Sequence, residues 1–421
     1  MRPSVSQLIL DFELPIGSGL EDSILRVFSS EKEYFETRSS SGREYKITLP
    51  HAFRATALMA KGGWRQTPRM SEPSRDLGQQ MWLNLPEDVR QSILSGTETN
   101  PQRVAILSRS CGIDDIPWEW LGTEDGELIA VLPSVRFVRL VPKRYVLPPM
   151  TITPPLSVLI VVTNPKDERL LDANVEIEVI KKGLSNSDHF TVEVLYEPRL
   201  EKLTEKLAHF QPHIVHYVGH AGISGGLGNL ILHDDVDGTV WLGPQDISAL
   251  FPSSVRLLCL STCVTTKNYQ VEGLSKFAHC DPEIPVPTTV VNQYALGKNG
   301  AEVFWREFYP GLCDVQGDIV EAFHNARMKV LADDPEPWWC WASFSLVIRD
   351  STGQPFRVAA ATDKPKARFE AELQAQWSAR LANDLASKML LLGDTAQQHW
   401  QKTLEDETAR LETFERDIES N

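Results

Sequence analysis

Between residues 156 and 349, apolar runs that suit buried strands alternate with amphipathic stretches that suit helices. The first run, LSVLIVVTNP (156–165), is a continuous β-branched segment of the kind that a parallel sheet buries on both faces. Further strands are predicted at 190–198, 213–219, 255–263, 287–296 and 341–349, and helices at 173–186, 200–210, 244–251, 273–280, 301–312 and 315–332. A hairpin is predicted at 230–242, where Asp-Gly supplies the turn. This repetition predicts right-handed crossovers and an α/β fold with a mostly parallel sheet flanked by helices.

The first 150 residues carry shorter strand signals. LILDFELPI and REYKITLPH are predicted as strands on either side of a Ser-rich turn. From residue 103 follow the strand RVAILSR, the segment IPWEWLG and the apolar run LIAVLPSVRFVRLV, and a proline-rich link closes the segment near residue 150. We therefore predict an N-terminal β-containing region (1–100) and a domain at 101–350, whose catalytic part is 151–350.

The last segment, 351–421, is predicted to be a C-terminal helical extension. Its apolar residues recur every four positions and form a stripe that winds slowly around a helix: Phe369, Leu373, Trp377, Leu381, Leu385 and Met389. A second amphipathic stretch follows Gly393 and Asp394, which suit a helix end and a new cap. The pattern fits either a helical pair packed on its own domain or a docking surface for a partner.

Charge and composition narrow the class of protein. Fifty-seven acidic and forty-two basic residues give a net charge of −15, which disfavours binding to nucleic acid or to an anionic membrane surface. The start of the chain is interrupted by acidic, Gly and Pro residues, and no apolar stretch approaches transmembrane length. The six cysteines are spread too widely for a secreted disulfide scaffold. We therefore expect a soluble cytoplasmic protein whose thiols are mostly reduced.

Candidate chemistry lies where two predicted strands end. His220 follows the strand 213–218, and Cys263 follows the strand 255–260. Reactive side chains collect at the carboxyl edge of a parallel sheet, and successive strands joined by one crossover are usually neighbours. An imidazole beside a thiol can take its proton as the sulfur attacks a carbonyl carbon, so the pair suits acyl transfer.

The other histidines and cysteines of these strands have structural explanations. Cys259 is expected in the core, His216 as a buried, hydrogen-bonded imidazole, and His213 at the far end of its strand. A zinc site built from these three residues with His220 and Cys263 would need ligands from both ends of one strand. A tetrahedral site gathers its ligands around one point, so we expect no metal and no cofactor.

The ordered set of motifs resembles the CHAT family, the caspase-like peptidases of bacteria and archaea. The resemblance rests on IPWEWLG, LSVLIVVTNP, HIVHYVGHAG, the STC that follows 43 positions after His220, EGLSKFA, VVNQY, FWREFYPGL and EAFHNAR, over roughly residues 100–350. It implies a caspase-like fold, with His220 as general base or electrostatic partner and Cys263 as nucleophile. The backbone N–H groups of Cys263 and Ala221 would form the oxyanion hole. Ala221 stands where the family usually has Gly, which keeps the N–H and restricts the backbone.

The resemblance also implies an extended protein substrate bound beside the sheet, with Asn292, Gln293 and Tyr294 lining its groove. It implies activation by a regulatory protein or a signal, in prokaryotic antiviral defence or cell death. The helical tail and residues 1–100 are the candidate partner-binding elements. The alternative is a pseudoprotease or scaffold that holds partners through the caspase-like domain and the tail.

Overall fold

The computed structural model describes seventeen stretches of the chain. They are residues 7–13, 23–29, 43–47, 72–108, 116–141, 149–152, 154–164, 173–185, 189–224, 227–233, 239–261, 277–278, 286–293, 298–314, 318–333, 340–349 and 354–358. The predicted helical tail, the nucleophile candidate Cys263 and Tyr294 lie outside the described residues.

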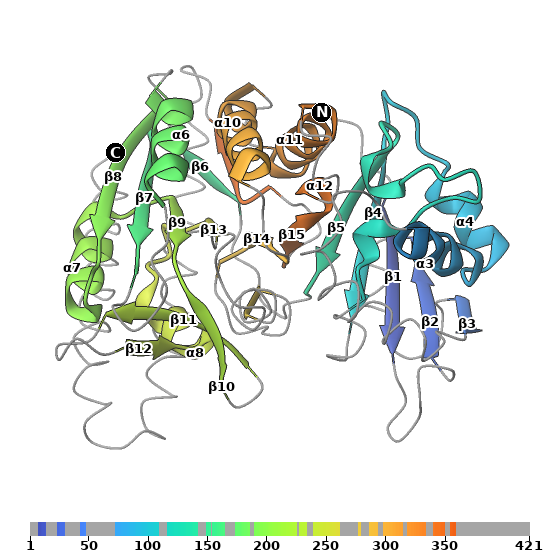
Figure 1. Ribbon diagram of the computed structural model, residues 1–421, viewed down its shortest axis with the longest axis horizontal. Helices are drawn as coiled ribbons and strands as arrows, with labels where there is room; N and C mark the ends of the chain where they lie inside the picture. The colour runs from blue at the N-terminus through green and yellow to red at the C-terminus, as the bar shows by residue number, and fades with distance from the viewer. Residues whose placement is uncertain are drawn as a thin grey trace, which may run out of the picture.

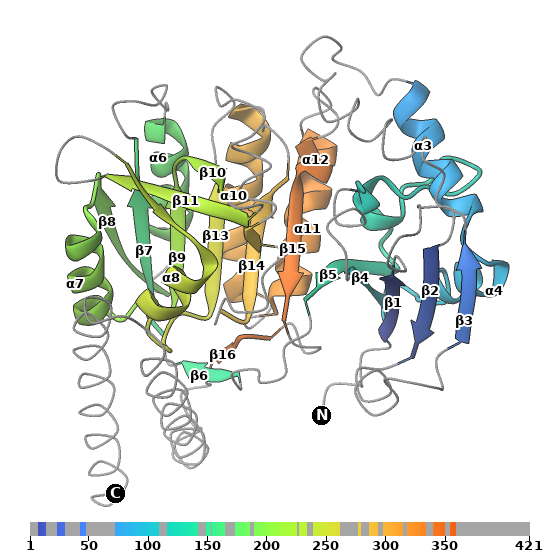
Figure 2. The same cartoon turned by 90° about the horizontal axis from the view of Figure 1, so that it is seen from below.

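Eleven of the described strands form one sheet (Figures 1 and 2). In spatial order these are β3 (Arg43–Ile47), β2 (Ser23–Phe28), β1 (Gln7–Glu13), β4 (Gln102–Ser108), β5 (Val135–Leu140), β15 (Phe344–Ile348), β14 (Thr288–Asn292), β13 (Leu257–Ser261), β9 (Ile214–Val218), β7 (Leu156–Val162) and β8 (Phe190–Tyr196). Only the pairs β1–β2, β2–β3 and β14–β15 are antiparallel, so the predicted mostly parallel α/β sheet is confirmed. Residues before position 100 continue this sheet, because β1 pairs in parallel with β4.

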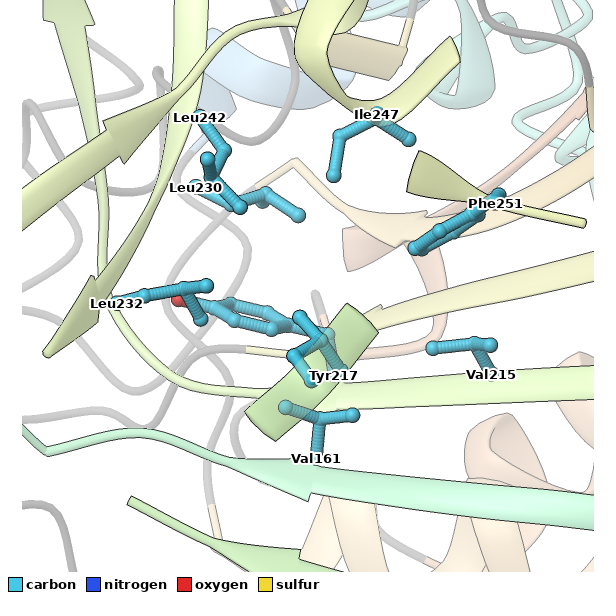
Figure 3. A pocket seen from close by; sticks show the side chains of 9 residues that line it. Val161, Val215, Tyr217, Leu230, Leu232, Leu242, Ile247 and Phe251 are labelled. Carbon is cyan, nitrogen blue, oxygen red and sulfur yellow. The ribbon is translucent and has the colours of Figure 1, made fainter. Parts of the chain in front are cut away.

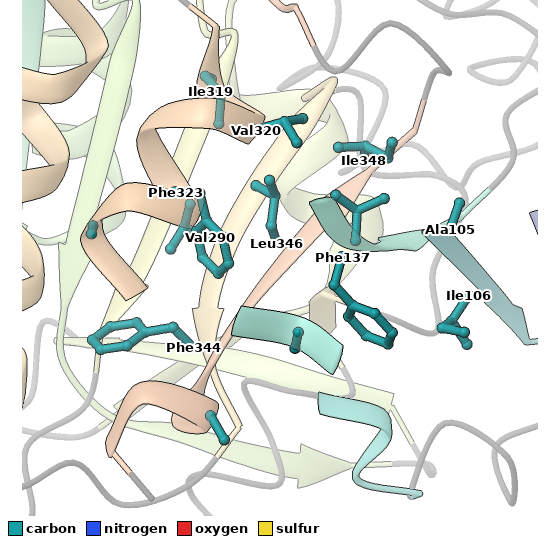
Figure 4. Packing of buried hydrophobic residues seen from close by; sticks show 14 of the residues in the cluster. Ala105, Ile106, Phe137, Val290, Ile319, Val320, Phe323, Phe344, Leu346 and Ile348 are labelled. Atoms are coloured by element: carbon teal, nitrogen blue, oxygen red, sulfur yellow. The ribbon is translucent and has the colours of Figure 1, made fainter. Parts of the chain in front are cut away.

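Helices cover both faces of the sheet (Figure 1). One face carries α6 (Ala173–Ser185), α10 (Lys298–Asp314), α11 (Ile319–Asp333) and the short α12 (Cys340–Ser343). The other carries α7 (Leu200–Phe210) and α8 (Pro244–Leu250), while α3 (Glu72–Leu83) and α4 (Glu87–Ile93) lie near β1 and β4. Figure 4 shows the core between β15, β5 and α11, where Phe323, Phe344 and Leu346 lie close together. The long apolar strands are therefore buried on both sides, as their unbroken runs predict.

A second sheet of three antiparallel strands lies beyond the carboxyl end of β9. It consists of β10 (Ala221–Ser224), β11 (Leu227–His233) and β12 (Thr239–Leu242), in that order. Three of its leucines face the large sheet, and Figure 3 shows Leu230, Leu232 and Leu242 around a small apolar space with Val161 and Tyr217 of the large sheet. The predicted hairpin corresponds to β11 and β12, whereas β10, a short strand that contains glycine, was not predicted.

Two further predictions differ locally from the structure. The run 128–141 is divided into a 3-10 turn at Ile129–Val131 and the strand β5, with Pro133 between them, because proline cannot donate a hydrogen bond within a strand. Residues 341–343 end a short helix, and only the part from Phe344 is strand. Another 3-10 turn, Trp118–Trp120, lies within IPWEWLG. A separate parallel pair joins β6 (Met150–Ile152) to β16 (Phe356–Val358). None of the described helices is long and apolar enough to span a membrane.

Candidate active site

The pairing of β9 with β13 aligns the two ends that the chemistry requires. The strands are parallel neighbours, and Val218 lies opposite Ser261. The Gly219 N–H donates to the Ser261 carbonyl oxygen at 3.1 Å, so the alignment continues beyond the strands. His220 and Cys263 each follow these paired residues by two positions. The predicted neighbouring of the two strands is confirmed, and the position of the Cys263 side chain stays a prediction.

His220 is fully buried and is held by the strand on its other side. Its Nε2 lies 3.3 Å from Oδ1 of Asn164, which follows β7, the other parallel neighbour of β9. The Asn164 N–H in turn donates to Glu197 Oε2 at 2.8 Å, and Glu197 also contacts Nε2 of His233. As placed, the amide oxygen accepts the Nε2 proton, which leaves Nδ1 as the basic nitrogen of the neutral ring. Asn164 is not among the residues predicted for the site, although its position directly after a buried strand was the available signal.

The backbone on both sides of His220 is fixed by a second set of contacts. The Tyr217 hydroxyl donates to the His220 carbonyl oxygen at 2.5 Å, and Thr163 Oγ1 donates to the Tyr217 oxygen at 2.9 Å. Burial raises the pKa of Tyr217, so its hydroxyl stays protonated and able to donate. A Cβ at Gly219 would lie 2.2 Å from Thr163 Oγ1 and 2.6 Å from the Tyr217 ring. Only glycine fits between these groups and the imidazole-bearing residue.

Cys259 and His216 are buried and belong to a polar cluster that lies along β13 and β9, before the carboxyl ends of these strands. His216 Nδ1 lies 2.6 Å from the Tyr309 hydroxyl, and Tyr309 also hydrogen-bonds Cys259. Burial lowers the pKa of His216 to about 3 and raises that of Cys259 to about 12, so both are neutral near pH 7. Ser261 Oγ donates to Glu176 Oε1 at 2.5 Å, which ties the end of β13 to α6. The burial of both side chains confirms the structural roles expected for His216 and Cys259.

His213 lies at the opposite end of β9 from His220. Its Nδ1 accepts the Ser157 N–H at 2.9 Å, and burial followed by the charge of Arg256 lowers its pKa to about 4. Among the described residues, no group of three His, Cys, Asp or Glu side chains is arranged to hold a metal ion.

The candidate groove residues lie at the end of β14. Asn292 is fully buried, and Gln293 is nearly so, with its Oε1 accepting from Arg139 Nη2 at 3.1 Å. The substrate contacts predicted for Asn292, Gln293 and Tyr294 stay predictions. In the described structure, the Gln293 side chain contacts a buried ion pair.

That ion pair joins Glu119 of IPWEWLG to Arg139 of β5. Arg139 donates to both carboxylate oxygens, at 2.9 and 2.5 Å, and Ser345 Oγ donates to Oε1 at 3.1 Å. Burial alone would raise the pKa of Glu119, but the charge and hydrogen bonds of Arg139, with the charge of Arg327, outweigh it and hold the pKa at about 2. Glu119 is therefore an ionised carboxylate that links β5, β15 and, through Arg139, the end of β14.

Comparison with known proteins shows to which family the chain belongs. The model of the CHAT domain matches residues 72–350, whereas no curated protein matches the sequence significantly. Separase from Saccharomyces cerevisiae, solved in complex with securin, resembles this chain with a TM-score of 0.47 and 10% identity, over 84% of this chain and 30% of the separase chain. The Arg-specific cysteine proteinase gingipain R resembles it with a TM-score of 0.40 and 11% identity, over 67% of this chain and 68% of that chain. The complex of the pro- and mature domains of Porphyromonas gingivalis RgpB resembles it with a TM-score of 0.39 and 10% identity, over 68% of this chain and 70% of that chain. Because the family model covers well over half of its length, the chain belongs to the CHAT domain family.

Proposed function

We propose that this protein is a cysteine endopeptidase that hydrolyses peptide bonds of a protein target with His220 and Cys263. The observation that carries the proposal is the parallel register of β9 and β13, in which Val218 lies opposite Ser261. Each candidate follows its strand by the same two positions, which supports a common site at the carboxyl edge, where α/β sheets bind ligands. Membership of the CHAT family supports the same assignment.

The reaction follows from ordinary thiol chemistry. The Cys263 sulfur loses its proton to His220 and attacks the carbonyl carbon of the scissile bond, whose oxygen becomes an oxyanion. When this intermediate collapses, the carbon–nitrogen bond breaks, and His220 gives the proton to the leaving amine. Water then attacks the thioester, with His220 as base, and releases the acid and the thiol. The hydrogen bond from Nε2 to Asn164 supports this cycle, because it orients the ring and stabilises the protonated imidazole.

Strand β10 supports the predicted oxyanion hole. Ile231 N–H donates to the His220 carbonyl at 3.0 Å, and Ala221 pairs with Leu230. In an antiparallel ladder, hydrogen-bonded pairs alternate with pairs that point their backbone groups outward. The Ala221 N–H is therefore directed away from β11, on the outer edge of β10, where it is available to an oxyanion together with the Cys263 N–H.

We further propose that the enzyme is latent until a partner protein or signal activates it. His220 and Ala221 are both fully buried, so a substrate reaches them only after the groups that cover them move. An activator that binds the open state more tightly would shift the population toward it. A cytoplasmic place in prokaryotic defence or cell death is the setting that the family resemblance suggests.

Covalent labelling tests the proposal. Wild-type protein is treated with peptide acyloxymethyl ketones, with and without cell lysate as a source of activator, and the modified residue is mapped by mass spectrometry. We expect selective labelling of Cys263 that His220→Ala abolishes. The matched control His209→Ala, on the exposed side of α7, should leave labelling intact. Labelling that is absent under every condition, or unaffected by His220→Ala, would overturn the proposal and favour the scaffold.

A further inference from the structure

Trp241 of β12 is a large apolar side chain left exposed close to His220. Its exposed fraction is 42%, and the other large hydrophobic residues exposed in the described part of the chain are Leu83, Leu94 and Tyr196, on other elements. Aromatic side chains with accessible faces are common anchors of protein recognition because they bury a large area at a low cost in side-chain entropy.

The strand register places Trp241 on the same face of the small sheet as His220. Ile231 pairs directly with Trp241, and its N–H bonds the His220 carbonyl. Residues opposite each other across an antiparallel sheet project from the same face. His220, the residue before β10, therefore forms one row with Ile231 of β11 and Trp241 of β12. The opposite face carries Leu230 and Leu242, which pack against the large sheet.

The indole does not stay above its own strand. A Cβ at Gly222 would lie 2.4 Å from Cη2 and Cζ3 of Trp241, so the far edge of the ring rests on the backbone of Gly222. Gly222 belongs to β10, two residues after His220 and on the same face. The ring thus crosses β11 and reaches the strand that begins beside the imidazole, and the absence of a side chain at Gly222 makes this approach possible.

We infer that Trp241 forms a specificity subsite that binds a large apolar side chain of the peptide substrate beside His220. This inference rests on the proposed function, in which the scissile bond of the substrate lies at His220. The indole edge lies at Gly222, two residues after His220 along the strand, which is about 7 Å and corresponds to roughly two residues of an extended peptide that runs beside β10. A peptide aligned with the outer edge of β10 would be the next strand of the small sheet, with alternate side chains above Gly222 and against the indole.

The test is a cleavage profile that covers both sides of the scissile bond. A peptide library prepared from a digested proteome is incubated with wild type, Trp241→Ala and Trp241→Phe, activated as above, and the new ends are identified by mass spectrometry. Cys263→Ala protein under the same conditions supplies the background. The exposed aromatic Tyr196, 52% accessible on β8, supplies the matched control Tyr196→Ala.

We expect wild type to prefer a large apolar residue at one position within about three residues of the cleaved bond. Trp241→Ala should lower kcat/KM for the best such peptide roughly tenfold, mainly through KM, and leave peptides with Gly or Ala at that position within about twofold. Trp241→Phe should keep most of the preference, and Tyr196→Ala all of it. Gly222→Ala should weaken it, because the new methyl group displaces the ring.

Three outcomes would overturn the inference while leaving the proposed function standing. In the first, the wild type shows no preference for an apolar residue near the cleaved bond. In the second, Trp241→Ala keeps that preference. In the third, Trp241→Ala lowers kcat equally for all peptides. Failure of the proposed function is recognised separately, because Cys263 would then escape labelling in the wild type.

Discussion

Glu119→Gln is expected to destabilise the fold strongly. The substitution keeps the size of the side chain and removes the negative charge between Arg139 and Arg327, both of which are buried. Arg139 would lose its charged partner while its guanidinium stays out of water. Removing one member of a buried ion pair typically costs about 3–5 kcal/mol, because the other charge is left uncompensated.

The pKa of Glu119 gives an independent magnitude. Folding lowers it from 4.5 to about 2, and at 1.36 kcal/mol per pKa unit this corresponds to about 3 kcal/mol of stability at neutral pH. Because the folded pKa lies below the unfolded one, this contribution is fully present above the unfolded value of 4.5 and is lost as the pH falls toward about 2. The stability difference between wild type and Glu119→Gln should therefore shrink over that interval.

Equilibrium urea unfolding of both proteins, at pH values from 7 down to 2, measures this difference. Glu205→Gln is the matched control. It removes an ion pair in which the Lys202 and Glu205 side chains are 63% and 58% exposed. Exposed pairs contribute about 0–1 kcal/mol, so the control should change stability little. The reasoning is refuted if Glu119→Gln costs no more than the control, or if its cost is the same at pH 3 as at pH 7.

Three further substitutions test the surroundings of the site. Asn164→Ala should lower kcat about ten- to a hundredfold and leave the free energy of unfolding unchanged. Asn164→Asp should raise the pKa of His220 and move the acid limb of the pH–kcat/KM profile to higher pH. Profiles identical to that of the wild type would contradict the contact between Asn164 and His220. Gly219→Ala should lower the free energy of unfolding by several kcal/mol and abolish Cys263 labelling. The control Gly183→Ala, whose new Cβ would have its nearest contact at 3.7 Å, should be neutral or slightly stabilising in thermal unfolding. Tyr309→Phe removes a buried hydroxyl and should lower the free energy of unfolding by about 1–3 kcal/mol; an unchanged urea midpoint would argue against the cluster.

The fold was largely predictable because its main signal is local. The apolar runs that became β7, β9 and β13 are long and unbroken, since both faces of these strands are covered, and the amphipathic stretches between them cover those faces. Prediction was wrong where a short segment gains its structure from its partner. β10 is a four-residue strand because it pairs with β11, and residues 341–343 form a helix although the apolar run continues through them.

The candidate site divides in the same way. The amino-acid pattern alone places His220 after one buried strand and Cys263 after another, because a strand must end where its apolar run ends. Three features became visible in the folded chain: the register of β9 with β13, the contact of Asn164 with the imidazole, and the reach of Trp241 across a strand to Gly222. These contacts join residues far apart in the chain, and the periodicity of a segment specifies which face is buried without specifying the partner that covers it.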